Sequence, residues 1–233
     1  MPPELTILMP VYNESERIDR ALADVFGTDW PFPVELIVVD DGSTDGTRDF
    51  LRSYAWPDWA HVHMHERNQG KGGAVRTALG HATGRYSVIF DADLEYQAGE
   101  LVQLVQPLRD GIANAAFGVR VFDGFTSHSF LYVMGNRFVT LAANVLFNVY
   151  LHDLMTCFKA IRTDIFRDLR LRESGFTIEP EIAARLIQRG ERIYEVPISY
   201  RARSFEEGKK LTTRDGLRTL ATLVRCRLRP LPR

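Results

Sequence analysis

The clearest candidates for chemistry in this chain are three carboxylates that follow one apolar run. Residues 86–90 read Tyr-Ser-Val-Ile-Phe, and Asp91, Asp93 and Glu95 come directly after them. Carboxylates held close together repel one another unless a cation or protons intervene. Ligand sets made only of oxygen atoms favour Mg²⁺ or Mn²⁺ over Zn²⁺. The pattern predicts a cation site that could bind a phosphate, although a polar turn after a buried strand has the same composition.

A second pair of carboxylates, Asp40 and Asp41, opens the segment Asp-Asp-Gly-Ser-Thr-Asp-Gly-Thr at 40–47, again after an apolar run. A carboxylate at a strand end can accept a hydrogen bond from the ring N–H of a base or from a ribose hydroxyl. Ser43 or Thr44 could cap the following helix instead. The abundance of acidic residues favours a ligand role over capping alone.

The third candidate is a glycine-rich loop, Asn-Gln-Gly-Lys-Gly-Gly at 68–73, which contains Lys71. Backbone N–H groups at a helix start, together with a lysine, suit a pyrophosphate. The spacing matches neither the P-loop nor the dinucleotide fingerprint. An oxidoreductase of the dinucleotide-binding type is therefore disfavoured.

The elements around these motifs alternate between strands and helices. The sequence predicts strands at 5–9, 34–39, 61–65 and 86–90, and helices at 15–26, 44–54 and 72–82. Such alternation indicates βαβ units and a Rossmann-like, mostly parallel sheet flanked by helices. In these sheets ligands bind beyond the carboxyl ends of the strands. The carboxylates and the segment 10–14 should therefore meet at one edge.

The second half of the chain is expected to complete the same domain, because no low-complexity linker or internal repeat separates it. Helices are predicted at 101–109, 131–151 and 182–188, with strands at 115–119 and 192–200. From residue 213, five apolar residues recur at helical spacing among arginines. They are Leu217, Leu220, Ala221, Val224 and Leu228. This pattern predicts a basic amphipathic helix.

Composition limits the class of protein. The chain of 233 residues is 45% hydrophobic and 25% charged, which is ordinary for a globular protein. From residue 201 onward ten basic residues face three acidic ones, so residues 1–200 carry 19 basic and 27 acidic groups and a balance of −8. A basic tail favours an anionic partner such as a phosphate, a lipid headgroup or a nucleic acid.

Two further classes are disfavoured by composition. Two cysteines, Cys157 and Cys226, are too few for a disulfide framework. We also expect no signal peptide and no membrane span, because the longest central apolar run falls short of about 20 residues.

Taken together, the motifs resemble the family 2 glycosyltransferases with a GT-A fold, of the dolichol-phosphate mannose synthase and polyprenyl-phosphate glycosyltransferase type. The resemblance covers nearly the whole chain and is carried by the segments 10–14, 40–47, 68–73, 91–95, 153–159, 175–182, 195–200 and 207–210. It implies one GT-A domain over 1–200, with a nucleotide-sugar half at about 1–118, an acceptor half at about 119–200, and a basic tail at 201–233.

The resemblance also implies roles for individual residues. The nucleotide-sugar site would comprise Pro10, Tyr12, Glu14, Asp40, Asp41, Lys71, Asp91, Ala92 and Asp93. Asp91, Asp93 and Glu95 would hold Mg²⁺ or Mn²⁺. The acceptor phosphate would be bound by Arg120, Arg137, Arg201 and Arg203. Here Gly-Val-Arg at 118–120 departs from the usual Gly-Ser-Arg, which removes one expected hydroxyl contact.

The implied reaction is a one-step inverting transfer, with Asp93, Arg120 and Asp153 as the catalytic residues. A cation and a lysine or arginine would stabilise the leaving diphosphate. A lipid phosphate, with a second pKa of roughly 6, is already anionic at neutral pH and needs no base. An alcohol or amine would need a positioned carboxylate. Asp153 is the first candidate for that base, and a turn hydrogen bond is its alternative role.

The preferred hypothesis is transfer from a GDP- or UDP-linked sugar to a polyprenyl or dolichyl phosphate in the cytoplasm. We expect peripheral contact with the cytoplasmic membrane face through the C-terminal helix, and no nucleic-acid partner. A soluble or carrier-bound acceptor is the alternative. A nucleotidyltransferase and a non-catalytic nucleotide-sugar binding module rank lower.

Three other residue groups receive structural expectations. His61, His63 and His65 alternate along a strand and so share one face, where contact with solvent is more common than metal binding. Glu179 and Glu181 stand at a helix start, where acids favour the helix dipole. An acceptor-site role for them is possible through the resemblance. Cys157 is expected to be a small buried residue.

Overall fold

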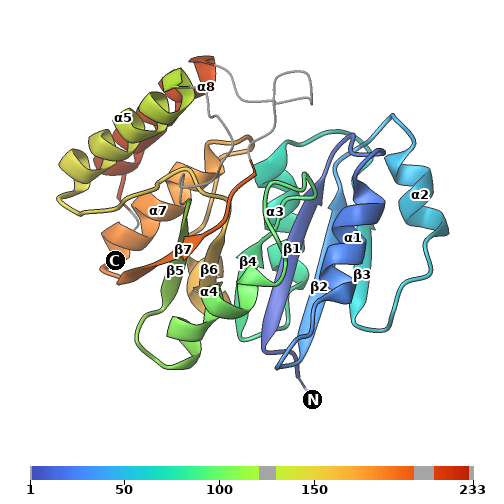
Figure 1. Cartoon of the computed structure of the whole chain (residues 1–233). Coiled ribbons are helices and arrows are strands. Elements are labelled where there is room, and N and C mark those ends of the chain that lie inside the picture. Colours follow the sequence, from blue (N-terminus) through green and yellow to red (C-terminus); the bar gives the residue numbers. More distant parts are fainter. Residues whose placement is uncertain (1, 121–129, 202–212, 231–233) are drawn as a thin grey trace.

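The computed structural model describes residues 2–120, 130–201 and 213–230, which form a mixed sheet with helices on both faces (Figure 1). Within these described residues, the sheet has seven strands in the order β3-β2-β1-β4-β6-β5-β7. The prediction of a single α/β domain with a mostly parallel sheet is confirmed.

The first half is a regular alternation of strands and helices. Its elements are β1 (Leu5–Val11), α1 (Ile18–Gly27), β2 (Val34–Asp40), α2 (Thr47–Ser53), β3 (Ala60–Met64), α3 (Lys71–His81) and β4 (Tyr86–Ile89). Strand β1 pairs in parallel with β2 and with β4, and β2 pairs in parallel with β3. All seven elements occur where the sequence predicts them, with ends that differ by up to three residues.

The second half contains the antiparallel part of the sheet. Its elements are α4 (Glu100–Arg109), β5 (Ala115–Arg120), α5 (Phe130–Phe147), β6 (Lys159–Arg162), α6 (Thr163–Asp168), α7 (Ile178–Arg189), β7 (Ile193–Ile198) and α8 (Thr213–Leu228). Strand β6 runs antiparallel to both β4 and β5, whereas β7 pairs in parallel with β5 at the edge. The sequence did not predict β6 or α6, because four and six residues are too few to show a period.

The core lies on both faces of the sheet. Alternate residues of β1 face opposite sides: Leu5, Ile7 and Met9 pack with α1 and α4, whereas Leu8 packs with α3 and α7. Both faces are covered, so the central strands are apolar throughout their length. The proposed halves 1–118 and 119–200 share this sheet, because β6 lies between β4 and β5. Where the boundary between them falls remains a prediction.

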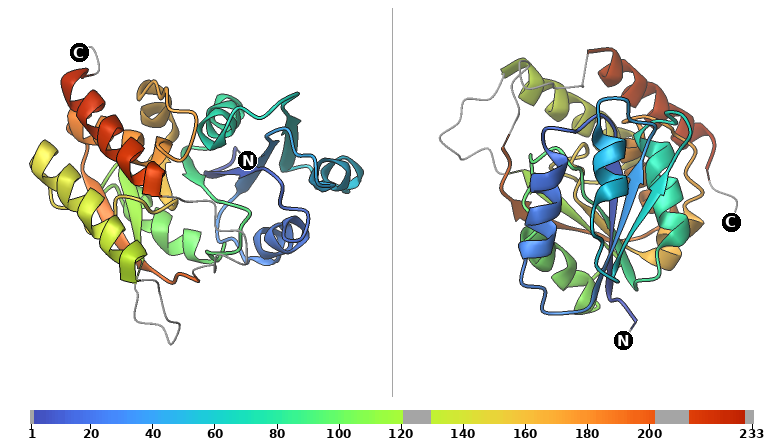
Figure 2. Two further views of the ribbon diagram at one scale, coloured as in Figure 1. Left: turned by 90° about the horizontal axis from the view of Figure 1, so that it is seen from above. Right: turned by 90° about the vertical axis from the view of Figure 1, so that its right-hand side faces the viewer.

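Helices α5 and α8 pack against each other beside the sheet (Figures 1 and 2). The predicted C-terminal helix is present, but its apolar stripe points outward: Leu217, Val224 and Leu228 are exposed. The residues that α8 buries are Thr219, Thr222, Leu223 and Cys226. In the described parts of the chain, no helix is both long enough and apolar enough to cross a membrane.

Candidate functional site

A pocket of about 290 Å³ lies at the carboxyl edge of the sheet. Eight of the nine residues expected at the nucleotide-sugar site line it, namely Pro10, Tyr12, Glu14, Asp41, Lys71, Asp91, Ala92 and Asp93. Pro10 lies near the end of β1, and the others follow β1, β2 or β4 or open α3; the carboxyl ends of these parallel strands meet at this edge. The fold thus brings together segments that lie far apart in the sequence.

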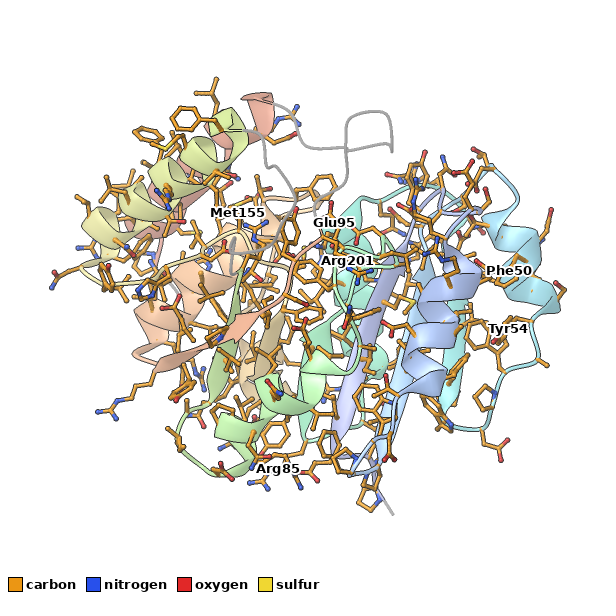
Figure 3. The ribbon with its side chains drawn as sticks, in the orientation of Figure 1. Phe50, Tyr54, Arg85, Glu95, Met155 and Arg201 are labelled. Carbon is orange, nitrogen blue, oxygen red and sulfur yellow. The ribbon has the colours of Figure 1, made fainter. Side chains whose placement is uncertain are left out.

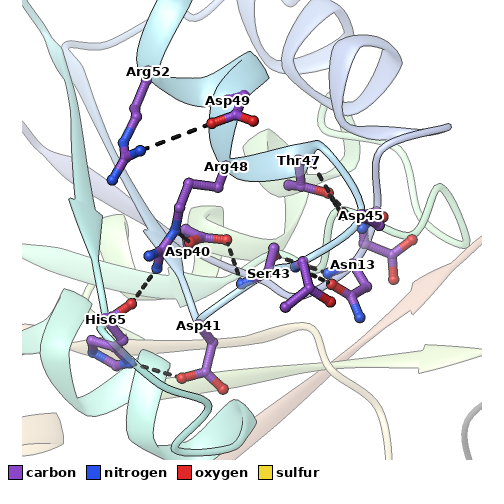
Figure 4. Close-up of polar contacts among 12 residues, drawn as sticks. Asn13, Asp40, Asp41, Ser43, Asp45, Thr47, Arg48, Asp49, Arg52 and His65 are labelled. Carbon is purple, nitrogen blue, oxygen red and sulfur yellow. Dashed lines mark hydrogen bonds and ion pairs between the residues drawn. The ribbon is translucent and has the colours of Figure 1, made fainter.

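Asp40 is the exception. It is fully buried behind the pocket wall, where its Oδ2 accepts a 2.7 Å hydrogen bond from Nε of Arg48 and its Oδ1 accepts one of 3.2 Å from the Ser43 amide (Figure 4). The structure therefore places Asp41, and not Asp40, at the pocket wall. Asp40 closes β2, so its side chain and that of Asp41 point to different sides.

Asp41 fixes the glycine-rich loop. Its Oδ1 accepts hydrogen bonds of 2.8 Å from the Gln69 amide and 2.7 Å from Nδ1 of His65, and its Oδ2 accepts one of 2.8 Å from the Gly70 amide. The other ring nitrogen of His65 lies 2.9 Å from Oγ1 of Thr77. The expectation that all three strand histidines face solvent is wrong for His65, which is buried just after β3 because Asp41 and α3 enclose it.

The loops after β1 and β2 are tied together. The Asn13 amide donates a 3.0 Å hydrogen bond to Oγ of Ser43, and the Thr44 amide donates one of 2.9 Å to Oδ1 of Asn13 (Figure 4). Ser43 and Thr44 do not cap α2, whose N-cap is Gly46. The Thr47 amide donates to Asp45 instead. Burial opposes ionisation of Asp45, but hydrogen bonds from Thr47 and Ser15 outweigh it and lower its pKa to about 2.

Lys71, the first residue of α3, is the centre of charge in the pocket. Its Nζ donates a 2.7 Å hydrogen bond to Oδ2 of Asp91 and lies 2.8 Å from Oε1 of Glu179. It also lies 3.3 Å from the half-buried Sγ of Cys157. Burial disfavours the charge, but the nearby Asp91, Cys157 and Glu179 hold the pKa of Lys71 well above its usual value. Lys71 therefore presents a fixed cation at the pocket.

The glycines beside Lys71 allow a close backbone approach. The Gly72 amide donates a 2.6 Å hydrogen bond to the Ser174 carbonyl, and a Cβ on Gly72 would lie 2.1 Å from the Glu173 carbonyl oxygen. Gly70 has a φ of 82°, a region that favours glycine. This approach brings Gly175 and Phe176 to the pocket.

Of the three expected metal ligands, Asp91 and Asp93 line the pocket. Oδ1 of Asp93 accepts a 3.1 Å hydrogen bond from the Glu95 amide. The Glu95 side chain accepts a 3.1 Å hydrogen bond from Tyr200, and its carbonyl accepts one from the Arg201 amide, so Glu95 and Arg201 lie together (Figure 3). Glu95 is not among the residues that line the pocket, and its role as a third metal ligand stays a prediction.

Within the described ranges, no three His, Cys, Asp or Glu side chains are grouped closely enough to hold a metal ion. Asp91 and Asp93 nevertheless fit the chemistry of Mg²⁺, which is usually held by one or two carboxylates together with substrate phosphates. Mn²⁺ takes the same oxygen ligands. The two carboxylates and the volume beside them are compatible with a cation that arrives with a diphosphate.

On the acceptor side, Arg120 forms a buried ion pair with Asp153. Its Nε and NH2 donate hydrogen bonds of 2.6 Å and 2.8 Å to the two carboxylate oxygens, and both side chains are buried. Asn136 of α5 also donates to Asp153, and the Tyr200 ring lies 4.9 Å from the Arg120 guanidinium. Burial opposes ionisation of Asp153, but Arg120 outweighs it and lowers the pKa of Asp153.

The other expected acceptor arginines are placed differently. Arg137 on α5 and Arg201 after β7 are exposed, and Arg203 lies outside the described residues. Neither Arg120, Arg137 nor Arg201 lines the pocket.

Sequence reasoning missed two parts of the site. Phe176 lines the pocket, and Glu179 pairs with both Lys71 and Lys159. The sequence places Glu179 only at a helix start or, through the resemblance, at the acceptor site. The one available signal is a lysine in an otherwise apolar segment, since Lys159 follows Phe158 and must be paired if buried.

The fold and the pocket define a nucleotide-sugar glycosyltransferase of the GT-A type. The model of glycosyl transferase family 2 matches residues 6–170, more than half of the chain, and the protein belongs to this family. It is therefore a glycosyltransferase.

Curated relatives agree with this assignment. Glycosyltransferase AglJ of Haloferax volcanii is 32% identical over 85% of this chain, and the match spans 63% of AglJ. The dolichyl-phosphate hexose transferase of the same organism is 30% identical over 87% of this chain and 85% of its own length. The polyprenol monophosphomannose synthase of Mycolicibacterium smegmatis is 28% identical over 87% of this chain and 79% of its own.

Among solved structures, glucosyl-3-phosphoglycerate synthase from Mycobacterium tuberculosis has a similar fold. In its complex with Mn²⁺, UDP and glucosyl-3-phosphoglycerate, the TM-score is 0.74 at 20% identity, covering 98% of this chain and 81% of that one. A complex with Mg²⁺ and UDP gives a TM-score of 0.73.

Proposed function

We propose that this enzyme transfers a sugar from a GDP- or UDP-linked donor to a polyprenyl or dolichyl phosphate, with inversion at the anomeric carbon. The observation that carries the choice of acceptor is the buried, two-point pairing of Arg120 with Asp153. A carboxylate held in this way is a poor general base, because its pKa is lowered and its oxygens are occupied. The proposal therefore favours an acceptor that is itself anionic.

A phosphate monoester meets this requirement. Its second pKa is roughly 6, so the oxygen that attacks the anomeric carbon carries charge at neutral pH without a protein base. Two of the matched relatives are named for transfers that involve dolichyl phosphate and polyprenol phosphate. Arg137 in the acceptor half and Arg201 at the start of the basic tail are exposed cations and are candidates for binding the phosphate.

At the donor side, Pro10, Tyr12 and Glu14 would line the nucleoside, and Lys71 would bind the diphosphate. Asp91 and Asp93 would hold Mg²⁺ or Mn²⁺, which on binding neutralises charge on the leaving diphosphate. Lys71, whose side chain is only 8% exposed, would add a fixed positive charge next to the bond that breaks. The fold relative is known in a complex with Mn²⁺ and UDP, which supports a donor site for a nucleotide and a divalent cation.

A lipid acceptor also suits the surface beside the acceptor half. Helix α5 exposes an apolar stripe of Phe130, Met134, Phe138, Leu141 and Val145, at intervals of three or four residues. Its neighbour α8 exposes Leu217, Val224 and Leu228. Exposed arginines at 137, 218, 225, 227 and 229 accompany these stripes. Apolar faces with arginines favour contact with an anionic membrane surface.

The test has two stages. Thermal-shift titrations with UDP, GDP and their sugars, with and without Mn²⁺, should first identify the nucleotide from a ligand-specific rise in Tm. The purified enzyme is then incubated with the matching sugar nucleotide, Mn²⁺ and either polyprenyl phosphate or 3-phosphoglycerate. An acid-labile glycolipid is expected.

Product formed only with the soluble phosphate would transfer the proposal to a soluble acceptor, the class named for the fold relative. Release of pyrophosphate from a nucleoside triphosphate would favour a nucleotidyltransferase. Tight donor binding without any product would favour a binding module.

A further inference from the structure

Behind the pocket wall, Lys71 belongs to a buried chain of ion pairs. Oε1 of Glu179 lies 2.8 Å from Nζ of Lys71, and Oε2 of Glu179 accepts a 2.8 Å hydrogen bond from Nζ of Lys159. Glu179 is only 2% exposed, and Lys159 is fully buried. With Asp91 on the pocket side, the four groups carry two positive and two negative charges. The cluster is therefore neutral as a whole.

The four residues come from four different elements. Lys71 opens α3, Asp91 follows β4, Lys159 opens β6 and Glu179 lies in the first turn of α7. Taking charges out of water is costly, and a buried ion pair often stabilises a protein no better than apolar residues of similar volume. The arrangement is better explained by a requirement for a cation at a defined place. Lys71 supplies this cation, and Glu179 holds its ammonium group from the side away from the pocket.

We propose that Glu179 is a positioning residue that retains the Lys71 ammonium at the pocket wall when a divalent cation and a diphosphate engage Asp91. The inference rests on the proposed donor site. In the structure Asp91 and Glu179 share Lys71. A cation at Asp91 competes with Lys71 for that carboxylate, and Glu179 keeps the ammonium in place for the diphosphate. Lys159 orients Glu179 and balances its charge.

This role predicts what happens when Glu179 is removed. Lys71 then has Asp91 as its remaining carboxylate partner in this cluster, so it competes more strongly with the incoming cation. Glu179→Gln should raise the Kd for Mn²⁺ about tenfold, the size expected for one lost charge near the site. The Kd for UDP or GDP in the presence of Mn²⁺ should rise as well, because Lys71 no longer faces the diphosphate.

The experiment measures binding and does not depend on turnover. Mn²⁺ alone is titrated into the full chain and followed by electron paramagnetic resonance, and UDP and GDP are titrated by calorimetry. Glu179→Gln leaves two lysines facing one carboxylate, which could destabilise the fold. The double variant Glu179→Gln with Lys159→Met is therefore included, because it restores a cluster with no net charge. The double variant is expected to bind Mn²⁺ weakly too, because Lys71 still pairs with Asp91.

A matched control is Glu35→Gln. Glu35 is also a buried carboxylate, but it binds Thr6 and Thr83 at the amino edge of the sheet and does not line the pocket. Its replacement should change stability and leave the Kd for Mn²⁺ unchanged. If Lys71→Met is combined with Glu179→Gln, the effect of the glutamate on Mn²⁺ binding should disappear, as a double-mutant cycle requires for a residue that acts through Lys71.

The outcomes separate the positioning role from the proposed function. Wild-type affinity in both Glu179 variants would overturn the positioning role and leave the donor site intact. Wild-type affinity for Mn²⁺ in the variant that combines Glu179→Gln with Lys159→Met would also overturn the positioning role, because only the net charge of the cluster would then matter. Failure of the wild-type chain to bind Mn²⁺, UDP or GDP would reject the proposed donor site, and the positioning role with it.

Discussion

The buried guanidinium of Arg120 donates two hydrogen bonds, of 2.6 Å and 2.8 Å, to the carboxylate of Asp153. Arg120 is the last residue of β5, and Asp153 lies in the segment after α5. A pair of this kind links the sheet to the loop that carries Asp153. Because both carboxylate oxygens accept hydrogen bonds from Arg120, we propose that Asp153 organises the acceptor side, and its role as a base stays an untested prediction.

Asp153→Asn should destabilise the fold, because it leaves the Arg120 charge buried without its carboxylate. Breaking a buried pair costs roughly 3–5 kcal/mol. Urea unfolding of the variant would measure the loss. The control is Asp164→Asn, which breaks the exposed Arg162–Asp164 pair and should cost about 0–1 kcal/mol.

The same pair predicts a dependence of stability on pH. The pKa of Asp153 is lower in the folded state than its usual value of 3.8, so its contribution is fully present above that value and is lost as pH falls through the lower, folded-state pKa. The free energy of unfolding should therefore differ less between wild type and Asp153→Asn in acid than at neutral pH.

Turnover tests the other possible role of Asp153. If folded Asp153→Asn has lost all turnover with polyprenyl phosphate, Asp153 would again be the candidate general base.

Asp93→Asn should remove one of the two carboxylates proposed to hold the cation. A loss of roughly 10²–10³ in kcat/KM is expected, similar to the loss of one electrostatic contact to a transition state. Initial rates at several Mn²⁺ concentrations would show it. Asp49→Asn, on an exposed face of α2, serves as the control and should be neutral. Full activity in Asp93→Asn would refute the metal role.

Two glycines of α3 should respond oppositely to the same substitution. Gly72→Ala places a Cβ against the Glu173 carbonyl and should cost about 1–3 kcal/mol while displacing the wall that holds Phe176. Gly80 has open space around its Cβ position, and Gly80→Ala should stabilise the helix by about 0.5–1 kcal/mol. Thermal unfolding with and without UDP measures both effects. Equal behaviour of the two variants would contradict the close approach.

The imidazole rings of His63 and His81 stack at 3.8 Å between centroids, which predicts a loss of stability in mild acid. Burial, and then the neighbouring His81, His61 and His65, lower the pKa of His63 below 6.5. The unfolded chain therefore takes up a proton first, and stability falls as pH drops below about 6.5. His81→Gln should flatten the dependence between pH 7 and 5, measured by urea unfolding. The same pH dependence of stability in wild type and His81→Gln would contradict a role for the stacked histidines.

The exposed stripe of α5 should mediate vesicle binding. Phe138→Ser with Val145→Ser removes two large apolar groups, each worth roughly 1.5–3 kcal/mol when buried, so co-sedimentation with vesicles rich in anionic lipid should fall at least tenfold. Ile112→Ser, an exposed apolar residue after α4, is the control. Dimers in sedimentation velocity, with no vesicle binding by the wild type, would instead assign the stripe to a second copy of the chain.

The sequence by itself determined where the pocket forms. Apolar strands followed by Pro10, Asp41 and Asp91 fix the carboxyl edge, because parallel strands end on the same side and their ends bring distant segments together. The glycine-rich loop before α3 was recognisable for a similar reason, since a backbone that approaches closely requires glycine.

Only the tertiary structure decided which side chains reach that pocket. Neighbours such as Asp40 and Asp41 differ by one position, and a shift of one residue turns a side chain to the other side. Glu95 is directed to Tyr200, and Asp153 to Arg120, by elements more than 30 residues away. Glu179 meets Lys71 because the segment just before α7 approaches the start of α3 closely. Pairings of this kind depend on how elements pack, and no local pattern of residues encodes them.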